Sequence, residues 1–261
     1  MEKNLIKYDL KKILKMPIIF YILGIVFAGL TRLCSTFDNI AIINIFKIIF
    51  STIEYAIWGN IIVHTFVQIL MRFNLNFYGD ESYLTHTLPA TKKQLLLSKY
   101  VSALITILCS VAALFVCVFI MFFSKQNIAM LKGYLDSISA GLNISPTLFI
   151  FLIVFAFFAE ICAITSMAFS SIIIGKRFNT KKNLKALLFT FGFYFATVIV
   201  TLIIACIVFA CMGNLSLLLG NNITGSMLIA LLIIAIAMYI IYAVAFYFVS
   251  LWQFKKGVNV D

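Results

Sequence analysis

The chain has 261 residues, of which 64% are apolar and only 11% are charged. An ordinary soluble domain carries about 25% charged residues, so this composition excludes that class. The formal net charge of +11 does not indicate nucleic acid, because the basic residues fall in short segments between long apolar runs. We therefore predict an all-α polytopic membrane protein that contacts the lipid bilayer and binds no nucleic acid.

The first segment, residues 1–16, is predicted to form an amphipathic helix at the membrane surface. Ile6, Leu10 and Ile13 recur at helical spacing, whereas lysines occupy the opposite arc. Pro17 would then begin the first membrane span at a new angle. The alternative is a plain basic flank of that span. No cleavable signal peptide is expected, because a small-residue cleavage site is lacking.

The remainder, 17–261, is predicted to form one membrane domain with six helical spans. A bilayer core of ~30 Å needs about 20 helical residues, and that measure defines the spans. They are placed at 17–34, 48–71, 101–123, 148–174, 187–212 and 225–251. The even number puts both termini on the same side of the membrane.

The distribution of basic residues orients these spans. Sixteen of the 20 lysines and arginines fall on the side that holds both termini. The other side has only Arg32, Lys47, Lys125 and Lys132, in or near the outer segments 35–47 and 124–147. Because cytoplasmic loops are enriched in Lys and Arg, we predict that the N- and C-termini are cytoplasmic.

The loop at 73–99, between the second and third spans, is unusually polar and contains clear signals for the end of one helix and the start of the next. Leu88-Pro89 ends any short helix over 82–87, because proline disfavours helix at the residue before it. Thr91 and Gln94 form a T-x-x-Q capping box, which predicts a helix that runs directly into the third span. Such a loop would transmit force to the span. The alternative is a solvated loop without a mechanical role.

The run from Asp80 to Lys99, DESYLTHTLPATKKQLLLSK, resembles the signature of bacterial ATP-binding-cassette (ABC) transporter permeases of the type-2 family. In that family an acidic, Tyr-containing stretch precedes Leu-Pro, a small residue, Ser or Thr, a basic residue and, further on, Ser-Lys. Here these features are Asp80, Tyr83, Leu88-Pro89, Ala90, Thr91, Lys92 and Ser98-Lys99. The motif covers this run alone, whereas the six-span layout with an interfacial N-terminal helix covers the whole chain.

The resemblance implies a permease subunit, expected to be an exporter, in the bacterial plasma membrane. Residues 1–16 would be the elbow helix, and the loop at 73–99 would couple the spans to a separate ATPase subunit. The coupling residues would be Asp80, Tyr83, Leu88, Pro89, Thr91, Lys92, Lys93 and Gln94. A second copy or a sister permease chain would complete the transporter. The segment 213–224 is short for this family, so the presence of re-entrant outer helices there stays open.

The chain itself lacks a nucleotide-binding motif. No G-x-x-x-x-G-K-[ST] sequence occurs, and Gly24 and Gly29 are followed by Leu-Thr inside an apolar run. We therefore expect no enzymatic activity and no bound cofactor in this chain, with ATP and Mg²⁺ held by the partner subunit. His64 and His86 are the only histidines, and neither stands in a metal-ligand pattern, so no metal site is predicted.

Several polar residues are predicted to lie within the membrane. Asn60, His64 and Gln68 repeat at four-residue spacing towards Arg72 in the second span, with Glu54 on a neighbouring azimuth. These residues would line a substrate path or meet another membrane domain, or they would make ordinary interhelical hydrogen bonds.

Glu160 lies midway along the fourth span, beside a face of small residues that permits close approach of another helix. It is expected to point into the bundle, as a functional switch or as a buried structural group.

Two other function classes remain open from the residues alone. An ion-coupled secondary transporter would use Glu54, His64 and Glu160 as proton sites, but it should show an internal repeat with broken spans. A non-transporting immunity or sensor-binding membrane protein would use the loop at 73–99 only as a docking surface. The sequence does not specify the substrate.

Overall fold

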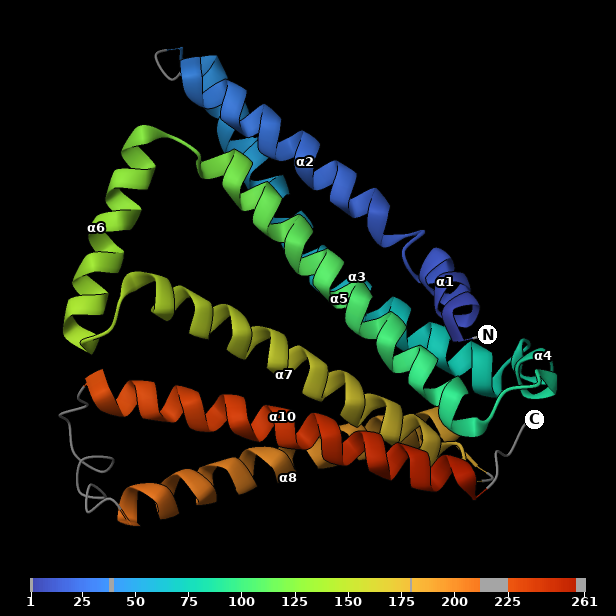
Figure 1. Ribbon diagram of the computed structural model, residues 1–261. Coiled ribbons are helices and arrows are strands. Elements are labelled where there is room, and N and C mark those ends of the chain that lie inside the picture. The colour runs from blue at the N-terminus through green and yellow to red at the C-terminus, as the bar shows by residue number, and fades with distance from the viewer. Residues whose placement is uncertain (1, 38–39, 179, 212–224, 257–261) are drawn as a thin grey trace. The chain divides into compact units, whose positions relative to one another are not determined.

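The computed structural model describes residues 2–37, 40–178, 180–211 and 225–256, which form helices joined by short connections (Figure 1). The all-α prediction is confirmed over these residues. In chain order the helices are α1 (Glu2–Ile13), α2 (Pro17–Cys34), the 3₁₀ turn η1 (Ser35–Phe37), α3 (Ala41–Tyr78), α4 (Ser82–Thr87), α5 (Lys92–Phe122), α6 (Lys125–Leu142), α7 (Pro146–Gly175), α8 (Lys182–Cys211) and α10 (Gly225–Lys255).

Six helices are long and apolar enough to cross a membrane: α2 extended by η1, α3, α5, α7, α8 and α10. The chain is therefore a multi-pass helical membrane protein, as its sequence predicts. The predicted first span coincides with α2, because Pro17 begins that helix and cannot continue the one before it.

The second span is longer than the predicted range 48–71. Helix α3 runs from Ala41 to Tyr78, and its 38 residues extend about 57 Å at 1.5 Å per residue. The prediction counted only the apolar stretch that fits a bilayer core of ~30 Å. Helix α3 continues further, so the first six residues of the loop assigned to 73–99 are helical.

The outer segment predicted at 124–147 contains a helix of its own, α6, which the sequence analysis did not anticipate. Helix α6 ends at Leu142, and the next residue, Asn143, has a positive φ of 55°, a conformation that asparagine tolerates just after a helix. The Ser145 side chain then accepts a hydrogen bond from the Leu148 amide and caps α7. The segment 213–224 lies outside the described residues.

The chain divides into two compact units, Met1–Asn76 with Asp80–Leu131, and Phe77–Gly79 with Lys132–Asp261. In the first unit α2 packs against α5, and Ala28 and Cys117 are fully buried at this contact. A Cβ atom on Gly24 would lie 2.8 Å from the Cys117 Sγ, so only glycine permits this approach. The expectation of one membrane domain over 17–261 stays a prediction.

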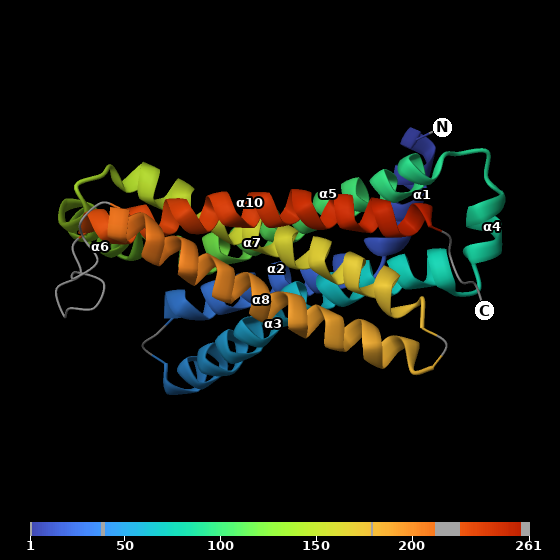
Figure 2. The ribbon, with the colours of Figure 1, turned by 90° about the horizontal axis from the view of Figure 1, so that it is seen from below.

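In the second unit α7 lies alongside α10 and also packs against α8 (Figures 1 and 2). The small-residue face of α7 is buried, and the Ser170 hydroxyl donates a 2.7 Å hydrogen bond to the Phe246 carbonyl of α10. At the end of α7, a Cβ atom on Gly175 would lie 2.5 Å from the Ala186 Cα of α8. Small residues thus permit close helix contacts, as expected for membrane helices.

Candidate functional site

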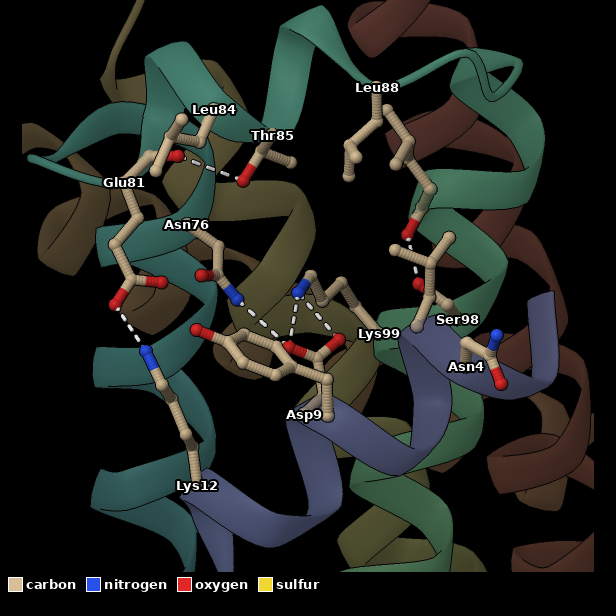
Figure 3. A pocket seen from close by; sticks show the side chains of 13 residues that line it. Asn4, Asp9, Lys12, Asn76, Glu81, Leu84, Thr85, Leu88, Ser98 and Lys99 are labelled. Carbon is tan, nitrogen blue, oxygen red and sulfur yellow. Dashed lines mark hydrogen bonds and ion pairs between the residues drawn. The ribbon is translucent and has the colours of Figure 1, made fainter. Parts of the chain in front are cut away.

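A buried carboxylate on α1 connects three helices of the first unit (Figure 3). Both oxygens of Asp9 lie 2.6 Å from the Lys99 ammonium at the start of α5. Asn76 near the end of α3 donates a further hydrogen bond of 3.1 Å to the same carboxylate. Asp9 is only 1% exposed, so these partners replace the water that its charge would otherwise need.

A second carboxylate, Glu81, extends these contacts to the loop predicted at 73–99, which we call the connector. Its Oε1 accepts a 2.8 Å hydrogen bond from the Lys12 ammonium of α1, and its Oε2 lies 2.7 Å from Arg72 Nη2 of α3. Arg72 Nε is also 3.8 Å from the Asp9 carboxylate, which links the two groups. We call Asp9, Lys12, Arg72, Asn76, Glu81 and Lys99 the ion-pair network.

The network keeps its exposed members ionised at neutral pH. The ion pair with Arg72, supported by Lys12, lowers the pKa of Glu81 to about 2 from its ordinary value of 4.5. In turn the hydrogen bond from Lys12 to Glu81 raises the pKa of the Lys12 ammonium. Both charges are therefore present across the physiological range, and the connector is tied electrostatically to α1 and α3.

The connector itself consists of a short helix, an extended break and a capped helix. Helix α4 covers 82–87, Leu88 is extended with ψ of 138°, and Pro89 follows. The Thr91 hydroxyl accepts a 3.3 Å hydrogen bond from the Gln94 amide, and the Gln94 side chain accepts a 3.0 Å hydrogen bond from the Thr91 amide. The predicted capping box is confirmed, and α5 continues without a break into the membrane span.

The residues proposed for coupling lie on the surface of this connector. Asp80, Tyr83, Leu88, Pro89, Thr91, Lys92 and Lys93 are exposed, and Gln94 is half-buried. Tyr83 is 76% and its neighbour Leu84 is 66% exposed, although both are outside the six span helices. Large apolar side chains at such positions are typical of a surface that binds another protein.

A pocket of about 560 Å³ lies between α1, α4 and α5, directly beside this surface (Figure 3). Leu5, Leu84, Leu88 and Leu95 supply apolar walls, and part of the ion-pair network lines the rest. The pocket therefore suits an apolar side chain of a partner protein. The charged residues that line it already pair with one another, so they do not require a charged ligand.

The polar residues predicted within α3 do not gather in one cavity. Asn60 is exposed and donates a hydrogen bond to the Ala56 carbonyl of its own helix, and His64 and Gln68 pair with each other at 3.4 Å. Glu54 is fully buried and accepts a 2.6 Å hydrogen bond from the Trp58 indole. Their roles in a substrate path stay predictions.

The second unit holds Glu160, the other predicted intramembrane acid. It is half-buried and lines a separate pocket between α7, α8 and α10.

The sequence prediction of site residues did not include Asp9, Lys12, Asn76 or Glu81. Asp9 occupies the apolar face of α1, four residues after Leu5 and four before Ile13, where an ionised group requires a buried partner. The position of Asp9 on an apolar helix face was therefore the one sequence signal that indicated a buried ion pair. The identity of the partner was not readable, because Lys99 is 90 residues away along the chain.

Among the described residues, no three His, Cys, Asp or Glu side chains are grouped so that they could hold a metal ion. In comparisons with protein-family models, with curated proteins and with solved structures, no match to this chain is found.

Proposed function

We propose that the chain is the permease subunit of an ATP-driven transporter of the ABC type, coupled through the connector at 73–99 to a separate ATPase subunit. The six membrane helices fit a membrane transporter subunit. The observation that carries the proposal is the connector: its exposed face, with Tyr83 and Leu88, is joined through Glu81 and Lys99 to three helices of one unit.

The mechanism follows from these contacts. A partner that presses on α4 would displace Glu81, and the ion pairs to Lys12 and Arg72 would carry that displacement to α1 and α3. The capping box makes the start of α5 rigid, so the same movement would tilt the third span. A repacking of the spans in response would alternate access to a substrate path.

Under this proposal the basic ends of the spans face the cytoplasm of a bacterial cell, where ATP is available. A second permease copy or a sister chain completes the transporter, ATP and Mg²⁺ belong to the partner subunit, and the direction is export. These elements rest on the resemblance of the run Asp80–Lys99 to the type-2 permease signature.

The test begins with a search of the neighbouring reading frames for an ATPase of the ABC type. That ATPase is co-expressed with the chain, and co-purification and ATP turnover in lipid vesicles are measured. Tyr83→Asp and Leu88→Asp should each abolish co-purification and the stimulation of ATP turnover. Tyr134→Asp is the matched control, because Tyr134 is 69% exposed on α6, beyond the other end of α5. Unchanged binding and turnover in the two connector variants would show that the ATPase does not bind there.

A further inference from the structure

We propose that the pocket between α7, α8 and α10 binds the ammonium group of an organic cation with a short apolar tail. The pocket has a volume of about 140 Å³, enough for a small organic group. It lies near the middle of all three helices, since Glu160 is close to the centre of Pro146–Gly175, Thr197 to that of Lys182–Cys211 and Tyr239 to that of Gly225–Lys255.

The acid in this pocket is Glu160, and its carboxyl group is not hydrogen-bonded within the described part of the chain. Among the residues that the structure describes, none donates a hydrogen bond to the Glu160 carboxylate or forms an ion pair with it. An ionised carboxyl group at the middle of a membrane span is costly, so a carboxylate at this depth favours a cationic partner.

Three of the hydroxyl groups around the pocket, those of Thr197, Thr201 and Tyr242, already make hydrogen bonds within the protein. The Tyr242 hydroxyl donates to the Thr197 carbonyl at 3.1 Å and lies 3.0 Å from the Thr201 hydroxyl. Thr201 itself donates to the Thr197 carbonyl at 2.8 Å. These bonds hold the Tyr242 and Thr201 side chains in place, so the carboxyl group of Glu160 is left for a ligand.

Aromatic rings complete the recognition of a cation. Tyr194, Tyr239 and Tyr242 all line the pocket, and the face of an aromatic ring attracts ammonium groups. A carboxylate flanked by tyrosine rings selects a cation over a neutral or anionic molecule. The charge and the rings therefore point to an organic ammonium group.

The outer part of the pocket suits an apolar tail. Val198 and Leu202 of α8 line it and are 40% and 61% exposed. They lie within a span, so their exposed side is available to acyl chains or to the apolar part of a ligand. A cation carrying an alkyl chain would place its ammonium at Glu160 and its tail along Leu202.

The test uses the full chain alone in nanodiscs of zwitterionic phosphatidylcholine, with tritiated hexylammonium as the probe and empty nanodiscs as background. Wild-type protein should bind the probe saturably, and hexanol and hexanoate should compete at least tenfold more weakly than unlabelled hexylammonium. Absence of saturable binding, or equal competition by the neutral and anionic analogues, would overturn the proposal.

Variants locate the site. Glu160→Gln should weaken binding at least tenfold, whereas Asp136→Asn, which removes an exposed carboxylate of α6, should leave the affinity within twofold. Equal affinity of Glu160→Gln and wild type would contradict the assignment. If Glu160→Gln does not fold, Tyr239→Leu and Tyr239→Phe are compared instead. Only the leucine variant should lose affinity for hexylammonium, because phenylalanine keeps the aromatic ring. Equal affinity of the two variants would reject a role for the ring of Tyr239.

The role of this cation as a transported substrate rests on the proposed function, but its binding does not. The binding test needs no ATPase and no ATP. Loss of hexylammonium binding with intact ATPase coupling would therefore reject only the pocket, and the reverse result would reject only the transporter assignment.

Discussion

The Lys99 ammonium lies 2.6 Å from each oxygen of the Asp9 carboxylate, so the start of α5 is bonded to the N-terminal helix across 90 residues of sequence. The side chains of both residues are under one-tenth exposed. An amphipathic surface helix is usually held by its apolar face alone. Here α1 is also held by a buried charge pair, which makes its position relative to α5 specific.

Loss of one partner of this pair should be strongly destabilising. Asp9→Asn removes the carboxylate that pairs with the buried Lys99 ammonium, and breaking a buried ion pair in this way costs about 3–5 kcal/mol. Thermal unfolding of the purified protein in a fixed detergent measures the effect. Lys11→Gln, on the exposed face of α1, should change stability by no more than about 0.5 kcal/mol.

A double-mutant cycle then separates the pair from its surroundings. Asp9→Asn combined with Lys99→Met removes both charges, so it should destabilise the protein by less than the sum of the two single changes. Strict additivity of the three measurements would show that Asp9 and Lys99 do not interact in the folded protein.

The contribution of Glu81 should depend on pH in a defined window. Its folded-state pKa is lowered to about 2 from 4.5, so its stabilising effect is complete above the ordinary value. The effect is lost as the pH falls from about 4.5 towards about 2, where the folded protein also takes up the proton. The difference in Tm between wild type and Glu81→Gln should be constant from neutral pH to about pH 5 and shrink below it. A constant difference down to pH 3 would contradict the ion pairing.

Two glycines of α2 should respond oppositely to the same substitution. A Cβ on Gly24 would lie 2.8 Å from the Cys117 Sγ, and such overpacking typically costs 1–3 kcal/mol. Gly29→Ala meets nothing within 4 Å and should be neutral or stabilising by up to about 1 kcal/mol, because alanine favours helix. Thermal unfolding compares the two variants, and Cys117→Ala should partly rescue Gly24→Ala. Equal stability of Gly24→Ala and Gly29→Ala would argue against the close contact of α2 with α5.

The capping box should control the first turn of α5. Thr91→Ala removes the side-chain acceptor of the Gln94 amide, which costs about 1 kcal/mol at a helix N-terminus. Hydrogen exchange of the amides from Lys93 to Leu95 should become roughly fivefold faster, because a loss of about 1 kcal/mol raises the population of the open state by about that factor. Thr91→Ser keeps the acceptor and is the control. Faster exchange in both variants would mean that the hydroxyl is not the cause.

The local signals of the sequence predicted much of this fold. Pro17 marks the start of α2, and the Thr91 and Gln94 pair marks the start of α5, because prolines and caps act on neighbouring residues. The exposure of the connector residues could also be anticipated, because the polar sequence around Pro89 is local too. The extension of α3 to Tyr78 could not be anticipated, because Arg72 and Asn76 near its end both lie against Asp9, which is far away along the chain.

The core of the candidate site depends on those distant contacts. Asn76 is 67 residues from Asp9, and hydrophobic periodicity carries no information about which charges will meet at such separations. Helix α6 was missed for a different reason: Gly133 and Gly141 lower its intrinsic helix propensity, and the neighbouring Pro146 indicates a loop.

The length of α3 makes the protein sensitive to membrane thickness. At about 57 Å it exceeds a core of ~30 Å even at a tilt of about 40°, so part of the helix always stands among the lipid headgroups or in water. Arg72 and Asn76, close to its end, can therefore lie beyond the hydrocarbon core, although both are buried within the protein. In lipids with longer acyl chains the hydrocarbon would advance along this helix, so bilayer composition should tune how firmly the N-terminal helix is held.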